Sequence, residues 1–183
     1  RVVERRHPLV ADVNTRFDVP HSRFNEVTRA QFEQAGLRIL VESEGAGVHL
    51  ATSADGFRIV FFQGHPEYDT VSLLKEYKRE VARYSKGERP DYPPLLDNYF
   101  SLKAQAILDE HRERVVAAHA QGQVVPEFPE PLISTSLDNT WHDTAEAVID
   151  NWVGKVYQIT NHDRRLPFQQ GTDPNNPLGL GHP

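Results

Sequence analysis

Three short runs rich in β-branched and aromatic residues follow one another at residues 37–41, 48–51 and 57–62. Two turn signals separate them, Glu-Gly-Ala-Gly at residues 44–47 and Ser-Ala-Asp-Gly at residues 53–56. Because short strands joined by such turns pair with their neighbours in the chain, the pattern predicts a strand meander. The last strand is apolar without alternation, which predicts burial beneath helices, as in an α/β fold.

Helical spacing of apolar residues predicts four helices around this meander. The first covers residues 25–35 and stops at Gly36, and the second covers residues 70–85 with Asp69 as its N-cap. A third runs from about residue 100 to residue 121, followed by a proline-containing connection over residues 123–139. The fourth covers residues 140–158, and its core-facing stripe is predicted to be Trp141, Ala145, Val148, Trp152, Val156 and Tyr157.

The last strand leads directly into Gln-Gly-His-Pro-Glu-Tyr-Asp at residues 63–69. An imidazole titrates near neutral pH and can take and return a proton, and a nearby carboxylate can fix its tautomer. His65 and Glu67 therefore resemble two members of a catalytic triad without a nucleophile. A His-x-Glu pattern on its own is more often a pair of exposed loop residues, so further sites are needed to support a catalytic role.

Two further groups of polar residues support it. Ser22 and Arg23 lie in Pro-His-Ser-Arg-Phe at residues 20–24, and a guanidinium there could bind a substrate carboxylate. The simpler interpretation is that Ser22 caps a helix. Glu76 and Arg79 stand three residues apart on a predicted helix and could bind the two ends of an amino acid zwitterion, or form a surface ion pair of little energetic value.

The sequence contains no cysteine and no methionine. Arg1 is therefore not expected to be the natural start: either these residues are the C-terminal part of a longer enzyme, or modified methionines were omitted. Within the chain, the absence of cysteine excludes disulfides, thiolate metal sites and a cysteine nucleophile. A catalytic cysteine would have to come from a preceding segment.

Charge and hydropathy exclude two classes of partner. The net charge is −6 and no dense block of Lys and Arg is present, which argues against nucleic acid as a partner. No apolar stretch approaches the ~20 residues that span a membrane, and no signal peptide is recognisable, so the cytoplasm is the expected location.

Five motifs in the same order resemble the homoserine O-acyltransferase family. They are Pro-His-Ser-Arg-Phe at residues 20–24, Gly-His-Pro-Glu-Tyr-Asp at 64–69, Glu-Tyr-Lys-Arg at 76–79, Asn-Tyr-Phe at 98–100 and Asn-Trp-Val-Gly-Lys-Val-Tyr-Gln-Ile-Thr at 151–160. This family transfers a succinyl or acetyl group from coenzyme A to the hydroxyl of L-homoserine in methionine synthesis.

The resemblance implies an α/β fold like that of class I glutamine amidotransferases, a flavodoxin-like, mostly parallel sheet flanked by helices. Residues 1–160 would be the C-terminal part of one acyltransferase domain, and residues 161–183 an extended, poorly ordered or surface-wrapping tail. The resemblance further implies a homodimer with acyl-CoA as co-substrate and no other cofactor or metal. The missing N-terminal part of the enzyme would supply the cysteine.

Site roles follow from the same resemblance, position by position. His65 corresponds to the general base and Glu67 to the acid that orients it. Ser22 and Arg79 match substrate-binding positions, and Arg23 and Glu76 are added as their neighbours. The acyl donor, and the choice between homoserine and serine as acceptor, are left open.

Three other interpretations also remain open. A relative with the same architecture could hydrolyse glutamine. A metal hydrolase could use His65, Glu67 and Asp69, although the chain lacks a second clear ligand cluster. The chain could also be a noncatalytic α/β interaction module, if no cysteine stands at a strand-to-helix elbow upstream.

Overall fold

A computed structural model describes residues 1–181, which fall into two compact units. The first unit combines residues 1–67 with residues from 140 onward, and the second is Tyr68–Asn139. Within the described residues, none of the helices combines the length and the apolarity that crossing a bilayer requires. The predicted division into residues 1–160 and a tail stays a prediction.

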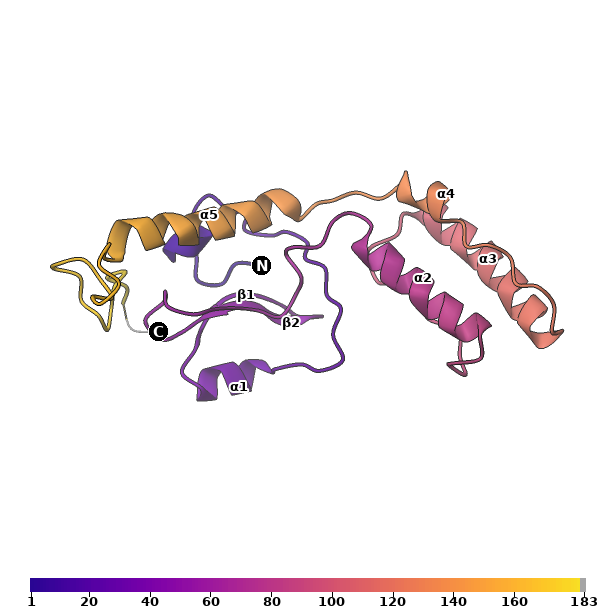
Figure 1. Cartoon of the computed structure of the whole chain (residues 1–183), viewed down its shortest axis with the longest axis horizontal. Helices are drawn as coiled ribbons and strands as arrows, with labels where there is room; N and C mark the ends of the chain where they lie inside the picture. The colour runs from indigo at the N-terminus through magenta and orange to yellow at the C-terminus, as the bar shows by residue number, and fades with distance from the viewer. Residues whose placement is uncertain (182–183) are drawn as a thin grey trace. The chain divides into compact units, whose positions relative to one another are not determined.

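The first unit is built on a three-stranded sheet in the order β1-β2-β3 (Figure 1). The strands are β1 at Arg38–Ser43, β2 at Gly47–Thr52 and β3 at Val60–Phe62, and both pairings are antiparallel. The predicted meander is therefore confirmed. The register of β1 against β2 shifts on either side of Val41, which marks a bulge in the ladder.

Helices cover both faces of this sheet (Figure 1). α5 (His142–Ile159) and the 3-10 helix η1 (Pro8–Val10) lie on one face, and α1 (Arg29–Gln34) lies on the other. The α/β class is confirmed. The three strands of this sheet are antiparallel. They do not form the mostly parallel sheet of the amidotransferase-like fold, which stays a prediction. Two buried clusters fill the two sides, Val2, Leu9, Val10, Leu40, Val41, Leu50 and Val148 towards α5, and Phe32, Val48 and Ala51 towards α1.

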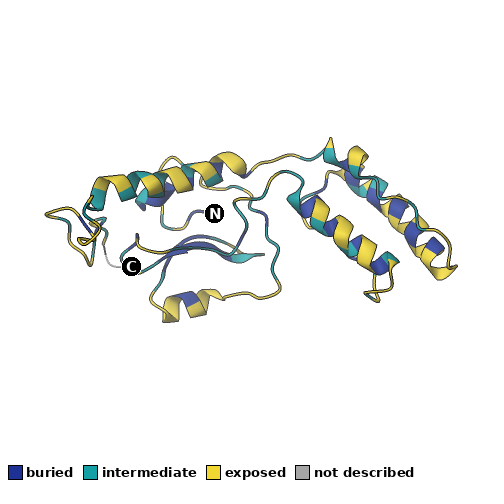
Figure 2. Ribbon diagram, viewed as in Figure 1, coloured by how far each residue is buried: buried dark blue, intermediate teal, exposed yellow. Residues whose placement is uncertain are grey.

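Burial within the sheet differs from the prediction at one strand. β3 was expected to be buried on both faces, but its residues are only half-buried and Ile59 just before it is exposed. The buried strand is β2, in which every residue after Gly47 is buried; it lies between the other two strands and appears mostly dark blue in Figure 2. The physical reason is position in the sheet, since β3 has a neighbour on one side only.

α1 is shorter than predicted. It begins at Arg29, where Thr28 and Gln31 form a capping box, so residues 25–28 are not helical. The Thr28 hydroxyl and the Gln31 side chain each accept a hydrogen bond from the other residue's backbone N–H. Ser22 lies six residues before this cap, and the suggestion that it starts the helix is wrong.

The second unit consists of α2 (Ser72–Ser85), α3 (Leu102–Ala120) and the short α4 (Glu130–Ser134). The predicted stripe of α2 is confirmed, because Leu73, Leu74, Tyr77, Val81 and Tyr84 are its buried residues. α4 lies in the predicted connection and was missed, although Ile133 within it is fully buried. Asp69 is not the N-cap of α2; its carboxylate accepts hydrogen bonds from the N–H of Val71 and the hydroxyl of Ser72.

α5 and the tail complete the first unit. Trp141 and Val148 are buried as predicted, but Tyr157 is 78% exposed, so the predicted stripe is wrong at its end. The described part of the tail lies against the unit rather than free of it. Phe168 is buried, Arg58 donates to the carbonyl of Pro174, and Arg38 donates to that of Gly181. Of the two predicted kinds of tail, poorly ordered or surface-wrapping, these contacts agree with the second.

Candidate functional site

His65 and Glu67 face each other just beyond the end of β3. Nδ1 of His65 lies 2.8 Å from Oε1 of Glu67. The His65 side chain is 32% exposed and the Glu67 side chain 66% exposed, so the pair is accessible from solvent. Such a pair contributes little to stability, but its geometry is the one in which a carboxylate fixes the proton on Nδ1, so that Nε2 is the nitrogen that can accept a proton.

A second chain segment, residues 20–22, holds His65 from the other side. The backbone N–H of His65 donates to the carbonyl of Pro20 at 2.8 Å. Nε2 of the imidazole lies 3.1 Å from the carbonyl oxygen of Ser22. Both ring nitrogens thus face acceptors, an arrangement that suits the doubly protonated imidazolium.

Gly64 allows these two segments to approach so closely. A Cβ atom at this position would lie 2.7 Å from Cγ1 of Val19, 2.8 Å from Nδ1 of His49 and 2.9 Å from the carbonyl oxygen of Pro20. All three distances are shorter than real Cβ contacts, so a side chain at residue 64 would push the segments apart. The glycine of the motif therefore positions the histidine beside it.

Arg23 lies within the protein rather than in open solvent. Its Nη1 is 2.6 Å from Nδ1 of His21, its Nη2 donates to the carbonyl of Ala46 at 2.7 Å, and Glu26 lies 3.3 Å away. Burial, the Arg23 cation and His65 lower the pKa of His21 to about 4, so its imidazole is neutral at pH 7. The predicted substrate-binding roles of Ser22 and Arg23 stay predictions, and these contacts give Arg23 a structural one as well.

Sequence reasoning missed His49, which lies at the centre of β2 and is 6% exposed. Its ring stacks edge-on against His21, with centroids 5.8 Å apart, and also contacts Phe17 and Phe62. Burial and the neighbouring His21 lower the pKa of His49 to about 3. Nδ1 has no hydrogen-bond partner among the described residues. The only signal in the sequence is a histidine inside an apolar strand.

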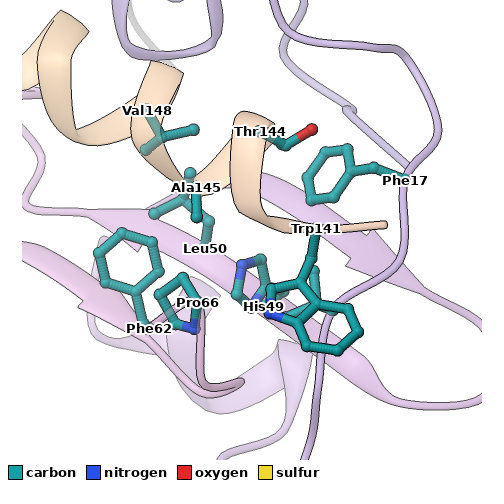
Figure 3. Close-up of a pocket in the computed structure, with 10 residues that line it drawn as sticks. Phe17, His49, Leu50, Phe62, Pro66, Trp141, Thr144, Ala145 and Val148 are labelled. Atoms are coloured by element: carbon teal, nitrogen blue, oxygen red, sulfur yellow. The ribbon is translucent and has the colours of Figure 1, made fainter. Parts of the chain in front are cut away.

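A small pocket lies beside His49, between the sheet and the start of α5 (Figure 3). Its open space is about 10 Å³, room for about one water molecule. Apart from His49 and Thr144, the side chains that line it are apolar: Phe17, Val19, Leu50, Phe62, Pro66, Trp141, Ala145 and Val148. This pocket is too small to bind a substrate. It is a small gap in the apolar packing next to the His65 segment and not a binding cleft.

Glu76 and Arg79, the remaining predicted site residues, lie on α2 in the second unit. The Tyr68 hydroxyl donates to Oε1 of Glu76 at 2.8 Å. Arg79 is exposed, and its Nε lies 3.4 Å from Oε1 of Glu80. Their predicted substrate-binding roles stay predictions, since the two units are described separately.

The structure brings together one group of side chains with metal-ligand chemistry, within the residues it describes. His142, Asp143 and Glu146 lie on the first turns of α5 with ligand atoms within 4.8 Å of one another. All three are exposed, and surface groups of this kind are common without an ion. The metal interpretation based on His65, Glu67 and Asp69 gains no support, because Asp69 is engaged at the start of α2.

Comparison with known proteins gives the same family as the motifs. A family model described as homoserine O-succinyltransferase matches residues 1–162. Relatives named homoserine O-succinyltransferase include those of Allochromatium vinosum, 69% identical over 98% of this chain, and Nitrosococcus oceani, 62% identical over 100% of it. The relative from Cardiobacterium hominis is 46% identical over 98%. These alignments cover 49–51% of the relatives, so the chain spans about half their length.

Proposed function

The chain belongs to the homoserine O-succinyltransferase family, and from this we propose that it supplies the acid–base half of an acyltransferase site. The reaction is the transfer of a succinyl group from succinyl-CoA to the hydroxyl of L-homoserine through an acyl-cysteine intermediate. The cysteine lies outside these 183 residues, which contain none. Acetyl-CoA as donor and L-serine as acceptor are the variants of this proposal that an assay must separate.

The contact between Nδ1 of His65 and Oε1 of Glu67, at 2.8 Å, carries the proposal. With Glu67 accepting from Nδ1–H, Nε2 of the neutral imidazole is the nitrogen that can take a proton, and the Ser22 carbonyl 3.1 Å away then accepts from the Nε2–H that forms. His65 is also exposed enough to meet a substrate. Glu67 stabilises the imidazolium that forms after His65 accepts a proton, as the third member of a triad does.

Two half-reactions follow from this arrangement. The cysteine sulfur attacks the thioester carbonyl, coenzyme A leaves as its thiolate, and His65 returns to that thiolate the proton it took from the cysteine. The hydroxyl oxygen of homoserine then attacks the acyl-cysteine carbonyl while Nε2 of His65 takes the hydroxyl proton. The carbon–sulfur bond breaks, and the same proton goes to the cysteine sulfur, which restores the starting state.

The wider roles complete the proposal. Ser22, Glu76 and Arg79 are candidates to bind the amino and carboxylate groups of homoserine, by the family motifs that contain them. For Arg23, the predicted substrate contact is one of two roles, which the kinetics of its variants separate. The product is an activated ester of homoserine on the route to methionine, and the enzyme is a cytoplasmic homodimer with no metal. Support for these points comes from the family, not from contacts in this chain.

The test uses the complete enzyme, in which these residues are joined to the segment that supplies the cysteine. His65→Gln is compared with His142→Gln, because His142 also pairs with a glutamate, Nε2 to Oε1 of Glu146 at 3.1 Å, but lies on the surface of α5. We expect His65→Gln to lower turnover of succinyl-CoA and L-homoserine by about 10²–10⁴-fold, and His142→Gln to leave turnover unchanged.

The same assay separates the alternatives. Acetyl-CoA replaces succinyl-CoA, L-serine replaces L-homoserine, and glutamine hydrolysis is measured in parallel. Near-normal turnover in His65→Gln would remove the mechanism. Glutamine hydrolysis without acyl transfer would favour an amidotransferase-like enzyme instead.

A further inference from the structure

We propose that residues 20–23 form a brace that orients His65, and that Arg23 is a positioning residue of this brace rather than a ligand of the substrate. The inference rests on the proposed function, since it assigns His65 as the base. It gives the backbone of this segment a role that is separate from the predicted contact of the Ser22 side chain with substrate.

Two carbonyl groups of the brace contact His65 directly. The Pro20 carbonyl accepts from the backbone N–H of His65 at 2.8 Å, and the Ser22 carbonyl lies 3.1 Å from Nε2 of its ring. The first contact fixes the main chain, and the second, together with Glu67, fixes the plane of the imidazole. A ring held at both nitrogens has little freedom to rotate.

Arg23 holds the brace against the sheet. Its guanidinium contacts the carbonyl of Ala46, in the turn before β2, and Nδ1 of His21 within the brace itself. Because a guanidinium can only donate, His21 has to accept at Nδ1 and carry its own proton on Nε2. A neutral His21 is what its buried surroundings favour.

The other side of the brace is packed against β2 and Gly64. His21 lies edge-on against the buried His49, and Nδ1 of His49 and the Pro20 carbonyl both lie within 2.9 Å of a Cβ built at Gly64. The brace therefore cannot move inwards, and Arg23 prevents it from moving outwards. The Arg23 side chain is only 21% exposed, so binding a substrate carboxylate would require it to leave contacts already made.

Steady-state kinetics of the complete enzyme test this role with three variants. Arg23→Gln removes the cation and shortens the donor, Arg23→Lys keeps the charge but has no planar fork, and Ser22→Ala deletes the hydroxyl while leaving the carbonyl in place. Arg58→Gln is the matched control, because Arg58 likewise pairs with a carboxylate, that of Asp55, and donates to a carbonyl, that of Pro174.

We expect Arg23→Gln to lower kcat by about 10–100-fold, because an imidazole displaced by up to about 1 Å loses rate on this scale. KM for L-homoserine should stay within about twofold of wild type. Arg23→Lys should recover part of the loss, and Arg58→Gln should match wild type. A rise in KM for L-homoserine with unchanged kcat in Arg23→Gln would make Arg23 a substrate ligand and overturn the proposal. Ser22→Ala removes the hydroxyl that is predicted to contact L-homoserine, so it should raise KM for L-homoserine instead, while the Ser22 carbonyl stays beside His65.

A measurement independent of turnover separates this proposal from the proposed function. With ¹⁵N-labelled histidine, the ring signals of His65, assigned by their loss in His65→Gln, report the hydrogen bonds at Nδ1 and Nε2. In the imidazolium form, which carries a proton on both nitrogens, we expect the Nε2 signal to shift and its proton to exchange faster in Arg23→Gln but not in Arg58→Gln. Unchanged His65 signals in Arg23→Gln would refute the brace even in an active enzyme. Shifted signals in an enzyme without acyl transfer would keep the brace and reject the function.

Discussion

Replacing Gly64 with alanine is the perturbation whose effect follows most directly from the geometry. The new methyl group would lie 2.7–2.9 Å from Val19, His49 and the Pro20 carbonyl, so these neighbours have to retreat by about 0.5–0.7 Å to reach ordinary contact. Overpacking of this kind costs about 1–3 kcal/mol of stability. The retreat also lengthens the hydrogen bond from the His65 N–H to the Pro20 carbonyl.

Catalysis should suffer more than stability. A misplacement approaching 1 Å costs about 10²-fold in rate, so we expect Gly64→Ala to lower kcat of the complete enzyme by about one to two orders of magnitude. Urea unfolding measures the change in stability, and initial rates at saturating substrate measure kcat. Gly45→Ala is the control, since a Cβ at Gly45 meets no described atom within 4 Å. Wild-type stability and turnover in Gly64→Ala would refute the reasoning.

Three further predictions concern stability, each measured by unfolding of the complete enzyme. Because burial holds the pKa of His49 near 3, the unfolded chain binds a proton at His49 below about pH 6.5 and the folded chain does not. The free energy of unfolding therefore falls by up to about 1.4 kcal/mol for each unit by which the pH is lowered. His49→Gln should make this fall less steep. Arg38→Leu breaks the donation to the Gly181 carbonyl and should cost about 1–3 kcal/mol, with faster tryptic cleavage of the C-terminal tail; an unchanged cleavage rate would contradict it. Thr28→Ala should cost about 1 kcal/mol through loss of the capping box with Gln31, and Thr28→Ser should restore it.

Most of the helices and strands could be predicted from the sequence, because their signals are local. The meander could be predicted because short strand runs are separated by turns that contain glycine. The buried stripe of α2 could be predicted because its apolar residues recur at helical spacing. The burial of β3 could not be predicted in this way, since it depends on which strands pair beside it. α4 was missed because a helix of five residues that follows one proline and contains another carries almost no periodic signal.

In the candidate site, too, contacts within one short motif could be predicted from the sequence, and contacts between distant segments could not. The contact of His65 with Glu67 could be expected from two residues in one short motif. The contacts of His65 with residues 20–22, and the place of His49 behind them, join segments more than 25 residues apart with no pattern that links them. Arg23 was assigned from its chemistry alone, and its partners Ala46 and His21 emerge only once the chain is folded.

The most direct test of the central claim is the turnover of the complete enzyme with Glu67→Gln, measured beside Glu146→Gln. Both substitutions remove the carboxylate of an exposed His–Glu pair, at 2.8 Å for Glu67 and 3.1 Å for Glu146, so neither should change the free energy of unfolding by more than about 1 kcal/mol. If Glu67 orients the catalytic base, Glu67→Gln lowers kcat by about 10²–10⁴-fold and Glu146→Gln leaves it unchanged. Equal turnover in the two variants would contradict the account.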